Sequence, residues 1–325
     1  MKAIIPVAGM GKRLRPHTHT QPKVLMNVAG KPILAYILDE IRDLGVNEVT
    51  LVVGHLAEKV EEWVRERYPF RAHFVYQDQP LGNGHALYVA REYLTDPTLV
   101  VFGDTIVQAD LSAATMLPHT AIGISRVQDP RAFGVVELNQ DGFVRRLWEK
   151  PSTPRSNLAV VGVYMIQHVV PFRRALERLV DEHRMVNGEY WLADALQILV
   201  DMGEQIETFA VDGWYDCGTP EALLRANRAL LEHIPPPHVQ IPGSVVIHPS
   251  AVAATAVVEG SVLGPYVTVA DGARVVNAVI RESIINANAK VESVLLEHSI
   301  IGDNASAVGR RGRINLGDSS EIELS

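Results

Sequence analysis

The carboxyl-terminal part of the chain repeats with a period of about six residues, and this repeat constrains the fold more than any other feature. Over residues 243–309 an aliphatic side chain recurs at Ile247, Leu263, Val269, Val275, Ile285, Val291 and Ile301. Gly, Ala, Ser and Asn fill most of the gaps. Such hexapeptide periodicity predicts a short left-handed parallel β-helix, whose coils stack aliphatic side chains inward. The alternative is an ordinary β-rich domain with coincidental spacing, and the irregular gaps leave the number of coils open.

Residues 1–233 follow a different pattern, in which short β-rich runs alternate with longer helical ones. The predicted strands are 2–8, 48–53, 72–77 and 99–102, and the predicted helices are 31–44, 57–68 and 84–94. Alternation of this kind predicts crossover connections and an α/β domain with a mixed, mostly parallel sheet. The proline-rich stretch 234–243 is interpreted as a linker. The predicted domains are therefore 1–233 and 244–325.

The loop after the first predicted strand is rich in glycine and in basic residues. Gly9 and Gly11 leave room for backbone N–H groups to approach a phosphate, while Arg13 and Lys23 add positive charge. A Rossmann fingerprint would need a third glycine, which is absent, and a P-loop would need a glycine where Pro6 stands. Residue types alone leave two interpretations open, a phosphate-binding loop and a plain tight turn. Ligands of open α/β sheets bind beyond the carboxyl ends of the strands, which places segments 9–15, 77–84 and 103–105 around one crevice.

The order of residues in this loop resembles the signature of sugar nucleotidyltransferases, G-x-G-x-R-L-x-P-x-T-x-x-x-P-K followed by G-K-P. The matching positions are Gly9, Gly11, Arg13, Leu14, Pro16, Thr18, Pro22, Lys23, Gly30, Lys31 and Pro32. Ala8 stands where the family more often has glycine, and Lys12 where it more often has threonine, but neither change removes a backbone donor. The resemblance implies a Rossmann-like nucleotidyltransferase domain. Within it, Ala8, Gly9 and Gly11 would bind the nucleotide, and Arg13 and Lys23 would be catalytic.

Further motifs follow in the order that the family shows. The run 77–86, QDQPLGNGHA, resembles the loop in which a glutamine and a glycine hydrogen-bond a pyrimidine ring, a role that this likeness gives to Gln77 and Gly82. Asp104 in FGDT and Asp216 in WYDCGT match the two carboxylates that bind magnesium, and Asp104 is also a catalytic position. The resemblance implies that the sugar phosphate contacts Gly134, Glu149, Lys150, Val160 and Tyr164.

Each of these residues also has an ordinary structural interpretation. A single aspartate after a strand is more often a turn or helix-cap residue, and Glu149 with Lys150 alone would be a surface ion pair. Trp191 and Trp214 fit a core or a cavity wall better than a ligand contact. Cys217, the one cysteine of the chain, is predicted to be a buried filler because no activating partner adjoins it. The functional interpretation depends on the joint order and spacing of the motifs.

The implied reaction is attack by a sugar 1-phosphate on the α-phosphorus of a nucleoside triphosphate, with release of pyrophosphate. Both reactants are anionic, so the site must supply positive charge and alignment. Mg²⁺ suits Asp104 and Asp216, because this hard ion takes one or two carboxylates and keeps several waters. The planar guanidinium of Arg13 suits the charge that builds on the pyrophosphate, and Lys23 and Lys150 would hold phosphates as point charges. The nucleophile is already ionised near neutral pH, so no general base is needed.

The substrates follow less directly from the resemblance. The arrangement is most similar to long-form glucose-1-phosphate thymidylyltransferases, which implies dTTP and glucose 1-phosphate. The run GNGHA also resembles the loop of uridylyltransferases, and a mannose-1-phosphate guanylyltransferase or a non-catalytic regulatory relative stays open. Acyl transfer by the β-helix, with His248 or His298 as the base, is a further alternative, although the repeat region is short for a complete acyl site.

Composition limits the classes of partner. The formal net charge of -8, with charges of both signs interspersed, gives no footprint for nucleic acid or for a membrane surface. No apolar run approaches the roughly 20 residues of a membrane span. The apolar start runs into Lys12, Arg13 and Arg15 without a cleavage site, so a buried strand is favoured over a signal peptide. We expect a cytoplasmic homo-oligomer that binds a nucleoside triphosphate and a sugar 1-phosphate.

Overall fold

The computed structural model describes residues 1–95, 97–235 and 241–309. The chain divides into two compact units. The first unit consists of Met1–Met26 and Lys31–Ala226, and the second consists of Asn27–Gly30 and the chain from Asn227 onward. The domain limits at residues 233 and 243 stay predictions. Residues 236–240 of the predicted linker and 310–325 of the predicted β-helix domain lie outside the described residues.

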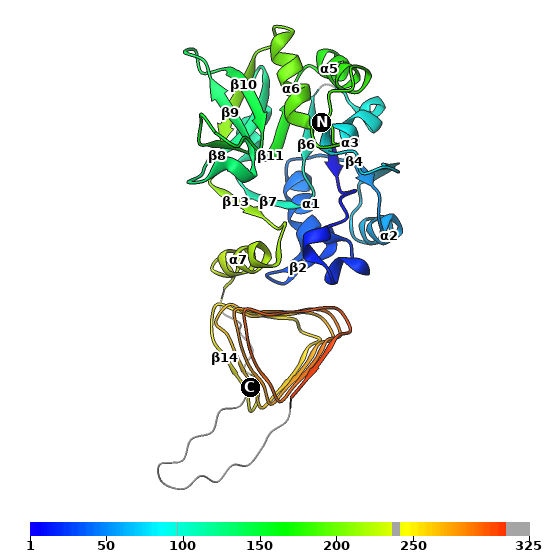
Figure 1. The fold of residues 1–325 in the computed structure, drawn as a ribbon. Coiled ribbons are helices and arrows are strands. Elements are labelled where there is room, and N and C mark those ends of the chain that lie inside the picture. Colours follow the sequence, from blue (N-terminus) through cyan, green and yellow to red (C-terminus); the bar gives the residue numbers. More distant parts are fainter. Residues whose placement is uncertain (96, 236–240, 310–325) are drawn as a thin grey trace. The chain divides into compact units, whose positions relative to one another are not determined.

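The first unit is built around a nine-stranded sheet (Figure 1). Its main path runs in the order β10-β9-β11-β6-β1-β4-β5, and β8 pairs with β11 on one side and β12 on the other. The strands are β1 (Lys2–Pro6), β4 (Glu48–Val53), β5 (Arg71–Tyr76), β6 (Thr98–Val101), β8 (Thr120–Arg126), β9 (Gly134–Leu138), β10 (Val144–Glu149), β11 (Leu158–Ile166) and β12 (Ile206–Ala210). Strands β5, β4, β1 and β6 are parallel, whereas β11 runs antiparallel to β6, β8 and β9. This arrangement confirms the predicted mixed, Rossmann-like sheet.

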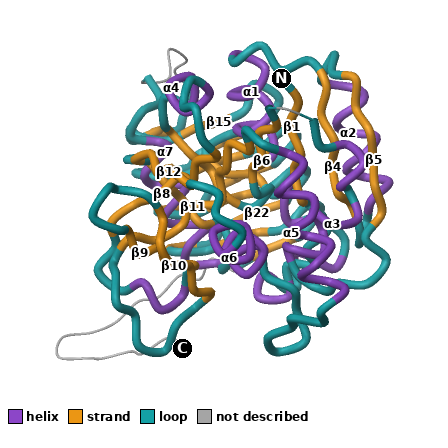
Figure 2. The backbone as a smooth tube through the Cα atoms, turned by 90° about the horizontal axis from the view of Figure 1, so that it is seen from above, coloured by secondary structure: helices purple, strands orange, loops and turns teal. Residues whose placement is uncertain are grey.

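Helices cover both faces of the sheet. They are α1 (Ile33–Asp43), α2 (Ala57–Arg67), α3 (Asn83–Val89), α4 (Leu111–Thr115), α5 (Val169–Asp181) and α6 (Leu192–Asp201), and a further helix, α7 (Pro220–Leu231), contributes to neither core cluster of the sheet. Ile4 of β1 packs into a cluster with α3, α5 and α6, while its neighbours Ala3 and Ile5 pack into a second cluster with α1 and α2. Because successive strand side chains point to opposite faces, burial on both sides requires the unbroken apolar runs seen in the sequence. Figure 2 shows β1, β4 and β5 side by side, as their pairing requires.

Several shorter elements connect these layers. The 3₁₀-helices span Lys12–Leu14, His17–His19, Lys23–Leu25, Arg91–Tyr93 and Pro130–Ala132. Strands β7 (Thr105–Gln108) and β13 (Gly213–Asp216) form an antiparallel pair, and the short strands β2 (Asn27–Val28) and β3 (Lys31–Pro32) precede α1.

Most predicted helix and strand limits agree with the structure within one or two residues, with two instructive differences. The helix predicted for 31–44 begins at Ile33, because Pro32 is extended (φ -60°, ψ 150°) and caps the helix instead of entering it. The helix predicted for 84–94 ends at Val89, and a separate 3₁₀ turn follows over Arg91–Tyr93.

The second unit contains a parallel β-helix with three sheets (Figure 1). The first sheet holds β14 (Val245–Val246), β17 (Val262–Leu263), β20 (Val279–Arg281) and β23 (Leu295–Glu297). The second holds β15 (Ala251–Val252), β18 (Thr268–Val269), β21 (Ile284–Ile285) and β24 (Ile300–Ile301), and the third β16 (Val257–Glu259), β19 (Arg274–Val276), β22 (Lys290–Glu292) and β25 (Ser306–Val308). Val245, Val262, Val279 and Leu295 pair in register, so one coil takes 16 or 17 residues. Three strands per coil explain the six-residue period.

The inward positions of the β-helix agree with the prediction at Leu263, Val269, Val275, Ile285 and Val291, all buried in one apolar cluster. Ile301 packs against that cluster. Ile247 is a wrong prediction, because its side chain is 42% exposed. In the first coil Val246 pairs with Leu263 and packs inward, which leaves Ile247 one residue out of phase.

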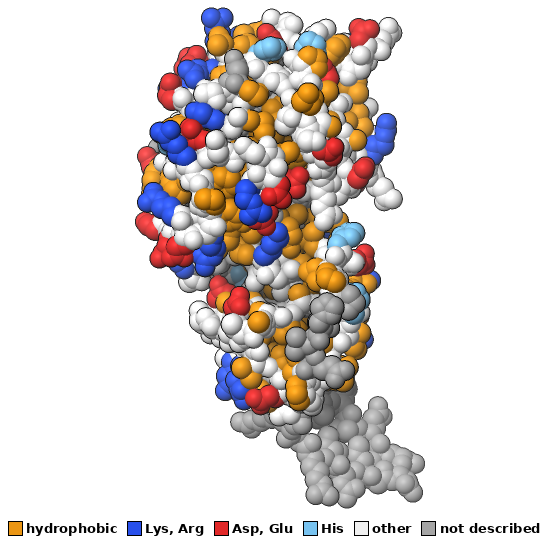
Figure 3. All heavy atoms as spheres, turned by 180° about the vertical axis from the view of Figure 1, so that it is seen from behind, with side chains coloured by type: hydrophobic (Ala, Val, Ile, Leu, Met, Phe, Trp, Pro, Cys, Tyr) orange, Lys and Arg blue, Asp and Glu red, His pale blue; other side chains and the backbone are white. Residues whose placement is uncertain are grey.

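The surface shows no broad field of one charge in Figure 3, where acidic and basic side chains intermingle on the visible face. Over the described part of the chain, no helix is both long enough and apolar enough to span a membrane.

Candidate active site

A cavity of about 390 Å³ opens beyond the carboxyl ends of β1, β5 and β6. Its wall contains Gly9 and Gly11 after β1, Gln77 and Gly82 after β5, and Asp104 after β6. The cavity thus brings together the three loops that the sequence predicts around one crevice. Parallel strands direct these loops to the same edge of the sheet, so three segments far apart in the chain share one site.

The first loop carries backbone donors that the protein itself does not use. The amides of Gly9, Met10 and Gly11 have no hydrogen-bond partner among the described residues. Gly11 is left-handed (φ 59°), and its carbonyl accepts a hydrogen bond of 2.8 Å from the hydroxyl of buried Thr18. A Cβ at Gly11 would lie 2.9 Å from Cγ2 of Thr18, which explains why this position is glycine. Successive free amides in such a loop form a concave anion site.

Lys23 and Asp104 form an ion pair at the cavity wall. The Nζ of Lys23 lies 2.7 Å from Oδ2 of Asp104, and the lysine side chain is 8% exposed whereas that of the aspartate is 43% exposed. Burial alone would raise the pKa of Asp104, but the ammonium of Lys23, helped by Arg13, holds this pKa below its usual value. Asp104 is therefore charged near neutral pH, and its carboxylate stays partly exposed at the wall of the cavity.

Asp216 comes close to Asp104 through the pairing of β13 with β7. Asp216 lies opposite Thr105, and the amide of Cys217 donates to the carbonyl of Asp104 over 3.2 Å. Burial raises the pKa of Asp216, and the negative charge of Asp104 adds to this effect although Lys23 opposes it. The two carboxylates thus repel each other across a partly buried space.

Arg13 reaches the same region from the first loop but does not line the cavity. A Cβ built on Gly218 would lie 2.7 Å from Nη2 of Arg13 and 3.0 Å from Oδ1 of Asp216, so both side chains approach the same glycine. Glycine at position 218 therefore leaves space for the side chains of Arg13 and Asp216, which any larger residue would fill. Cys217 is fully buried, as predicted, and burial raises the pKa of its thiol.

The residues expected to contact the sugar phosphate form a second cluster. A Cβ on Gly134 would lie 3.1 Å from Oε2 of Glu149 and 3.6 Å from Cβ of Val160, so these three residues are neighbours. The Nζ of Lys150 is 3.5 Å from Oε1 of Glu149 and 4.3 Å from the ring centroid of Trp191. Burial raises the pKa of Glu149, with Lys150 opposing the shift. Trp191 lines the cavity, which connects this cluster to it.

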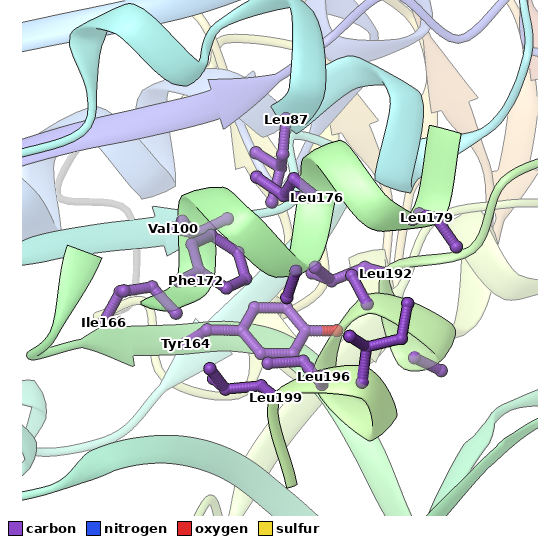
Figure 4. Packing of buried hydrophobic residues seen from close by; sticks show 14 of the residues in the cluster. Leu87, Val100, Tyr164, Ile166, Phe172, Leu176, Leu179, Leu192, Leu196 and Leu199 are labelled. Carbon is purple, nitrogen blue, oxygen red and sulfur yellow. The ribbon is translucent and has the colours of Figure 1, made fainter. Parts of the chain in front are cut away.

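Tyr164 differs from the other predicted contacts, because it is only 4% exposed and belongs to the hydrophobic core. Figure 4 shows its ring between Phe172 on one side and Leu196 and Leu199 on the other. The charge of Glu149 helps to raise the pKa of its phenol, although burial is the larger cause. In the described structure Tyr164 therefore supports the wall behind Glu149.

Some cavity residues were missing from the predicted site. Met10, Lys12, Pro80, Asn83, Glu189 and Trp191 also line the cavity. His85 contacts Gln77, with its Nδ1 3.0 Å from Nε2 of the glutamine. The run GNGHA carried the signal for Asn83 and His85, whereas nothing local marks Glu189, which is brought in by the segment before α6. Trp214 packs beside Phe133, with ring centroids 4.6 Å apart, and against the second hydrophobic cluster, in agreement with a core residue.

Comparisons with known proteins agree with this geometry. The model of the family described as "Nucleotidyl transferase" matches residues 2–233.

The chain belongs to the nucleotidyl transferase family.

Across its whole length, this nucleotidyltransferase is 33% identical to a glucose-1-phosphate thymidylyltransferase of Streptomyces antibioticus, covering 99% of that protein. It is 31% identical to the enzyme of the same name from Streptomyces griseus, with both chains fully covered. Among solved structures, a UDP-glucose pyrophosphorylase in complex with UDP-glucose matches 72% of this chain and 99% of its own, with a TM-score of 0.63 and 23% identity. That likeness shows the fold alone. Together the family and the full-length relatives make the chain a sugar nucleotidyltransferase.

Proposed function

We propose that this nucleotidyltransferase joins dTTP to glucose 1-phosphate, giving the nucleoside-diphosphate sugar and pyrophosphate. The observation that carries the proposal is the Lys23–Asp104 pair in one cavity with the free amides of the first loop. Positive charge, a partly open carboxylate and a row of donors are the groups that an attack at an α-phosphorus requires. The names of the full-length relatives support dTTP and glucose 1-phosphate. UTP is the alternative, supported by the run GNGHA.

The proposed roles follow from position. The amides of Ala8, Gly9 and Gly11 would bind the phosphates of the nucleotide, and Gln77 with Gly82 its base. Lys23 would hold the α-phosphate and align it for in-line attack. Arg13, which reaches the carboxylates from outside the cavity wall, would stabilise charge that builds on the leaving pyrophosphate.

On the sugar side, Lys150 would hold the attacking phosphate, and Glu149 would accept a hydrogen bond from a sugar hydroxyl. Gly134 and Val160 would form the floor under the sugar. A side chain on Gly134 would meet Glu149, so glycine at this position leaves that carboxylate free for the sugar hydroxyl. The attacking phosphate oxygen is already ionised, so the chain needs to position it and not to deprotonate it.

The described residues fit Mg²⁺ at this site. Burial raises the pKa of Asp216 and the charge of Asp104 adds to this shift, so a bound cation would relieve the repulsion between the two carboxylates. The described part of the chain holds no cluster of three or more His, Cys, Asp or Glu side chains suited to a metal. Two carboxylates suffice for an ion that keeps waters and phosphate oxygens as its other ligands. When bound, Mg²⁺ would neutralise charge on the triphosphate.

The substrate proposal is tested by pyrophosphate release from dTTP, UTP, GTP, ATP and CTP, each combined with several sugar 1-phosphates. We expect the highest kcat/KM with dTTP and glucose 1-phosphate. A strong preference for GTP with mannose 1-phosphate would overturn the choice of substrates, and no release with any pair would favour a non-catalytic relative.

Acyl transfer by the β-helix receives less support. The side chain of His298 is 62% exposed at the surface, with its Nδ1 3.4 Å from Oε2 of Glu282. Incubation with acetyl-CoA and amino-sugar phosphates should give no acetylated product.

Self-association is a further part of the proposal, supported by the first sheet of the β-helix. Val245, Val262, Val279 and Leu295 stand in register on its outer side, and the first, third and fourth are 56%, 42% and 73% exposed. A row of exposed aliphatic side chains is suited to burial against a second copy. Light scattering should give a mass above that of one chain, and Leu295→Glu should lower this mass.

The cytoplasmic location stays a prediction.

A further inference from the structure

The side-chain amide of Gln77 is held in one orientation by two neighbours. Gln77 follows β5, is 8% exposed and lines the cavity. Its Nε2 lies 3.0 Å from the carbonyl oxygen of Gly82 and 3.0 Å from Nδ1 of His85. A backbone carbonyl can only accept a hydrogen bond, so the NH₂ end of the amide, and not its oxygen, must face Gly82.

This orientation also fixes the protonation state of His85. The second hydrogen of Nε2 points at Nδ1 of His85, so that ring nitrogen must carry a lone pair and act as the acceptor. The imidazole is then neutral, with its proton on Nε2. Both amide hydrogens of Gln77 are thereby used within the protein. The group that Gln77 can still offer is Oε1, an acceptor without a partner among the described residues.

Gly82 contributes the opposite kind of group to the same wall. Its carbonyl accepts from Gln77 and from the amide of Ala86, but its own N–H has no partner in the part of the chain that the structure describes. The residue is left-handed (φ 96°) and also lines the cavity. The wall thus offers one acceptor, Oε1 of Gln77, and one donor, the N–H of Gly82.

An acceptor beside a donor distinguishes bases by their hydrogen-bonding edge. Uracil and thymine present a donor at N3 next to the acceptor O4, and guanine presents N1–H next to O6. Cytosine and adenine present the reverse, a ring nitrogen that accepts next to an amino group that donates. With N3 of a pyrimidine or N1 of a purine opposite Oε1 of Gln77, and the group at C4 or C6 opposite the N–H of Gly82, this wall matches keto bases and places like groups against amino bases. Buried polar groups left unpaired in this way are a strong source of discrimination.

We propose that His85 is a positioning residue that sets the base selectivity of the site, by fixing the amide of Gln77 so that a keto base is bound and cytosine or adenine is rejected. The inference rests on the proposed nucleotidyl transfer, in which Gln77 contacts the base. If the amide turned over, Nε2 would face the cavity, where it would donate to the ring nitrogen of cytosine and repel the N–H of a keto base. His85 acts through Gln77 and needs no contact with the substrate.

The surroundings of His85 favour the neutral ring. Its imidazole stacks on Tyr88 of the same helix and on Tyr190 from the segment before α6, with centroids 6.1 and 6.2 Å apart. Burial lowers the pKa of His85 below its ordinary value of 6.5. Charged residues next to the two tyrosines are Arg91, whose guanidinium lies over the ring of Tyr88, and Glu189, which precedes Tyr190, and burial alone accounts for the lowered pKa of His85.

Two substitutions separate the acceptor from the ring. His85→Asn can place an oxygen near the position of Nδ1 and loses the ring, whereas His85→Phe keeps the stacking on the tyrosines and loses the acceptor. Two ratios are measured. The first is kcat/KM for UTP over CTP with glucose 1-phosphate, and the second is the calorimetric affinity for UMP over that for CMP. We expect His85→Phe to lower both ratios at least about tenfold, mainly through KM. His85→Asn should keep them within about threefold.

The pH dependence gives an independent readout. Above pH 6.5 the wild-type ratio should be constant, and it should fall at lower pH as His85 gains the proton that blocks its acceptor. With His85→Asn the ratio should not follow this titration. Equal ratios in the wild type and His85→Phe would overturn the proposal, because the carbonyl of Gly82 alone would then orient the amide. Loss of selectivity in His85→Asn but not in His85→Phe would overturn it as well. Failure of the wild type to release pyrophosphate from any nucleotide would instead refute the proposed function.

Discussion

Asp104→Asn tests whether the charge of this carboxylate, and not its shape, serves the reaction. Asparagine has the same size and can still accept a hydrogen bond from Lys23, so the fold should persist. The site would lose a negative charge that we propose for the metal and for the alignment of Lys23. Loss of one such group costs about a hundredfold in turnover, or ~2.7 kcal/mol in the barrier.

The same substitution has a calculable effect on stability. Opposite charges 2.7 Å apart attract by ~6 kcal/mol at an effective dielectric constant of about 20. Because 43% of the Asp104 side chain is exposed, water screens the attraction between the two charges. The hydrogen bond from Lys23 to the asparagine would offset part of the attraction that is lost. We therefore expect a net loss of ~1–2 kcal/mol, which lowers the melting temperature by roughly 2–8 °C in a unit of this size.

The sign of the pH dependence follows from the lowered pKa of Asp104. A carboxyl group whose folded-state pKa is below its unfolded value of 3.8 stabilises the fold above that value, and this stabilisation is lost as the pH falls through the folded-state pKa. The melting temperatures of the wild type and Asp104→Asn should therefore differ at pH 7 and converge below pH 3.8.

The measurements are pyrophosphate release and scanning calorimetry, with Asp141→Asn as the matched control. Asp141 is exposed in the turn between β9 and β10, away from the cavity. The Asp141→Asn variant should keep the turnover and the stability of the wild type. The reasoning is refuted if Asp104→Asn retains more than a tenth of the wild-type rate, or if its melting temperature stays below that of the wild type at pH 3 by the same margin as at pH 7.

Three further substitutions test other parts of the structure. Arg13→Ala should lower pyrophosphate release at least about a hundredfold with little change in melting temperature, and near-normal release would remove it from the site. Gly82→Ala should raise the nucleotide KM and lower the melting temperature, because the new Cβ would lie 2.5 Å from the carbonyl oxygen of Tyr190 at a φ of 96°. Asn227→Ala should destabilise the second unit by about 2 kcal/mol, because its buried Oδ1 accepts a 2.8 Å hydrogen bond from the amide of Ala29. Denaturation curves of the whole chain check the last two, and unchanged curves would contradict them.

Local pattern determined much of the architecture of this protein. The six-residue period predicted the β-helix because each strand of a coil repeats the same inward position, and continuous apolar runs predicted strands covered on both faces. The period missed the phase of the first coil, where Ile247 points outward and Val246 inward. Only the pairing of Val246 with Leu263 fixes that phase, since a six-residue period cannot tell which of two neighbouring aliphatic residues points inward.

For the site, the sequence by itself determined which segments carry phosphate-binding and acidic groups, because their order matches that of a family. It also implied contacts for Tyr164, whose burial in the core depends on α5 and α6. The tertiary structure decided which groups remain free after the protein has satisfied its own hydrogen bonds. Lys23 could be predicted as a cation but not as the partner of Asp104, 81 residues away. Likewise, the acceptor that Gln77 presents depends on Gly82 and His85 occupying its NH₂ group, and hydrogen-bond polarity of this kind exists only once the side chains are packed.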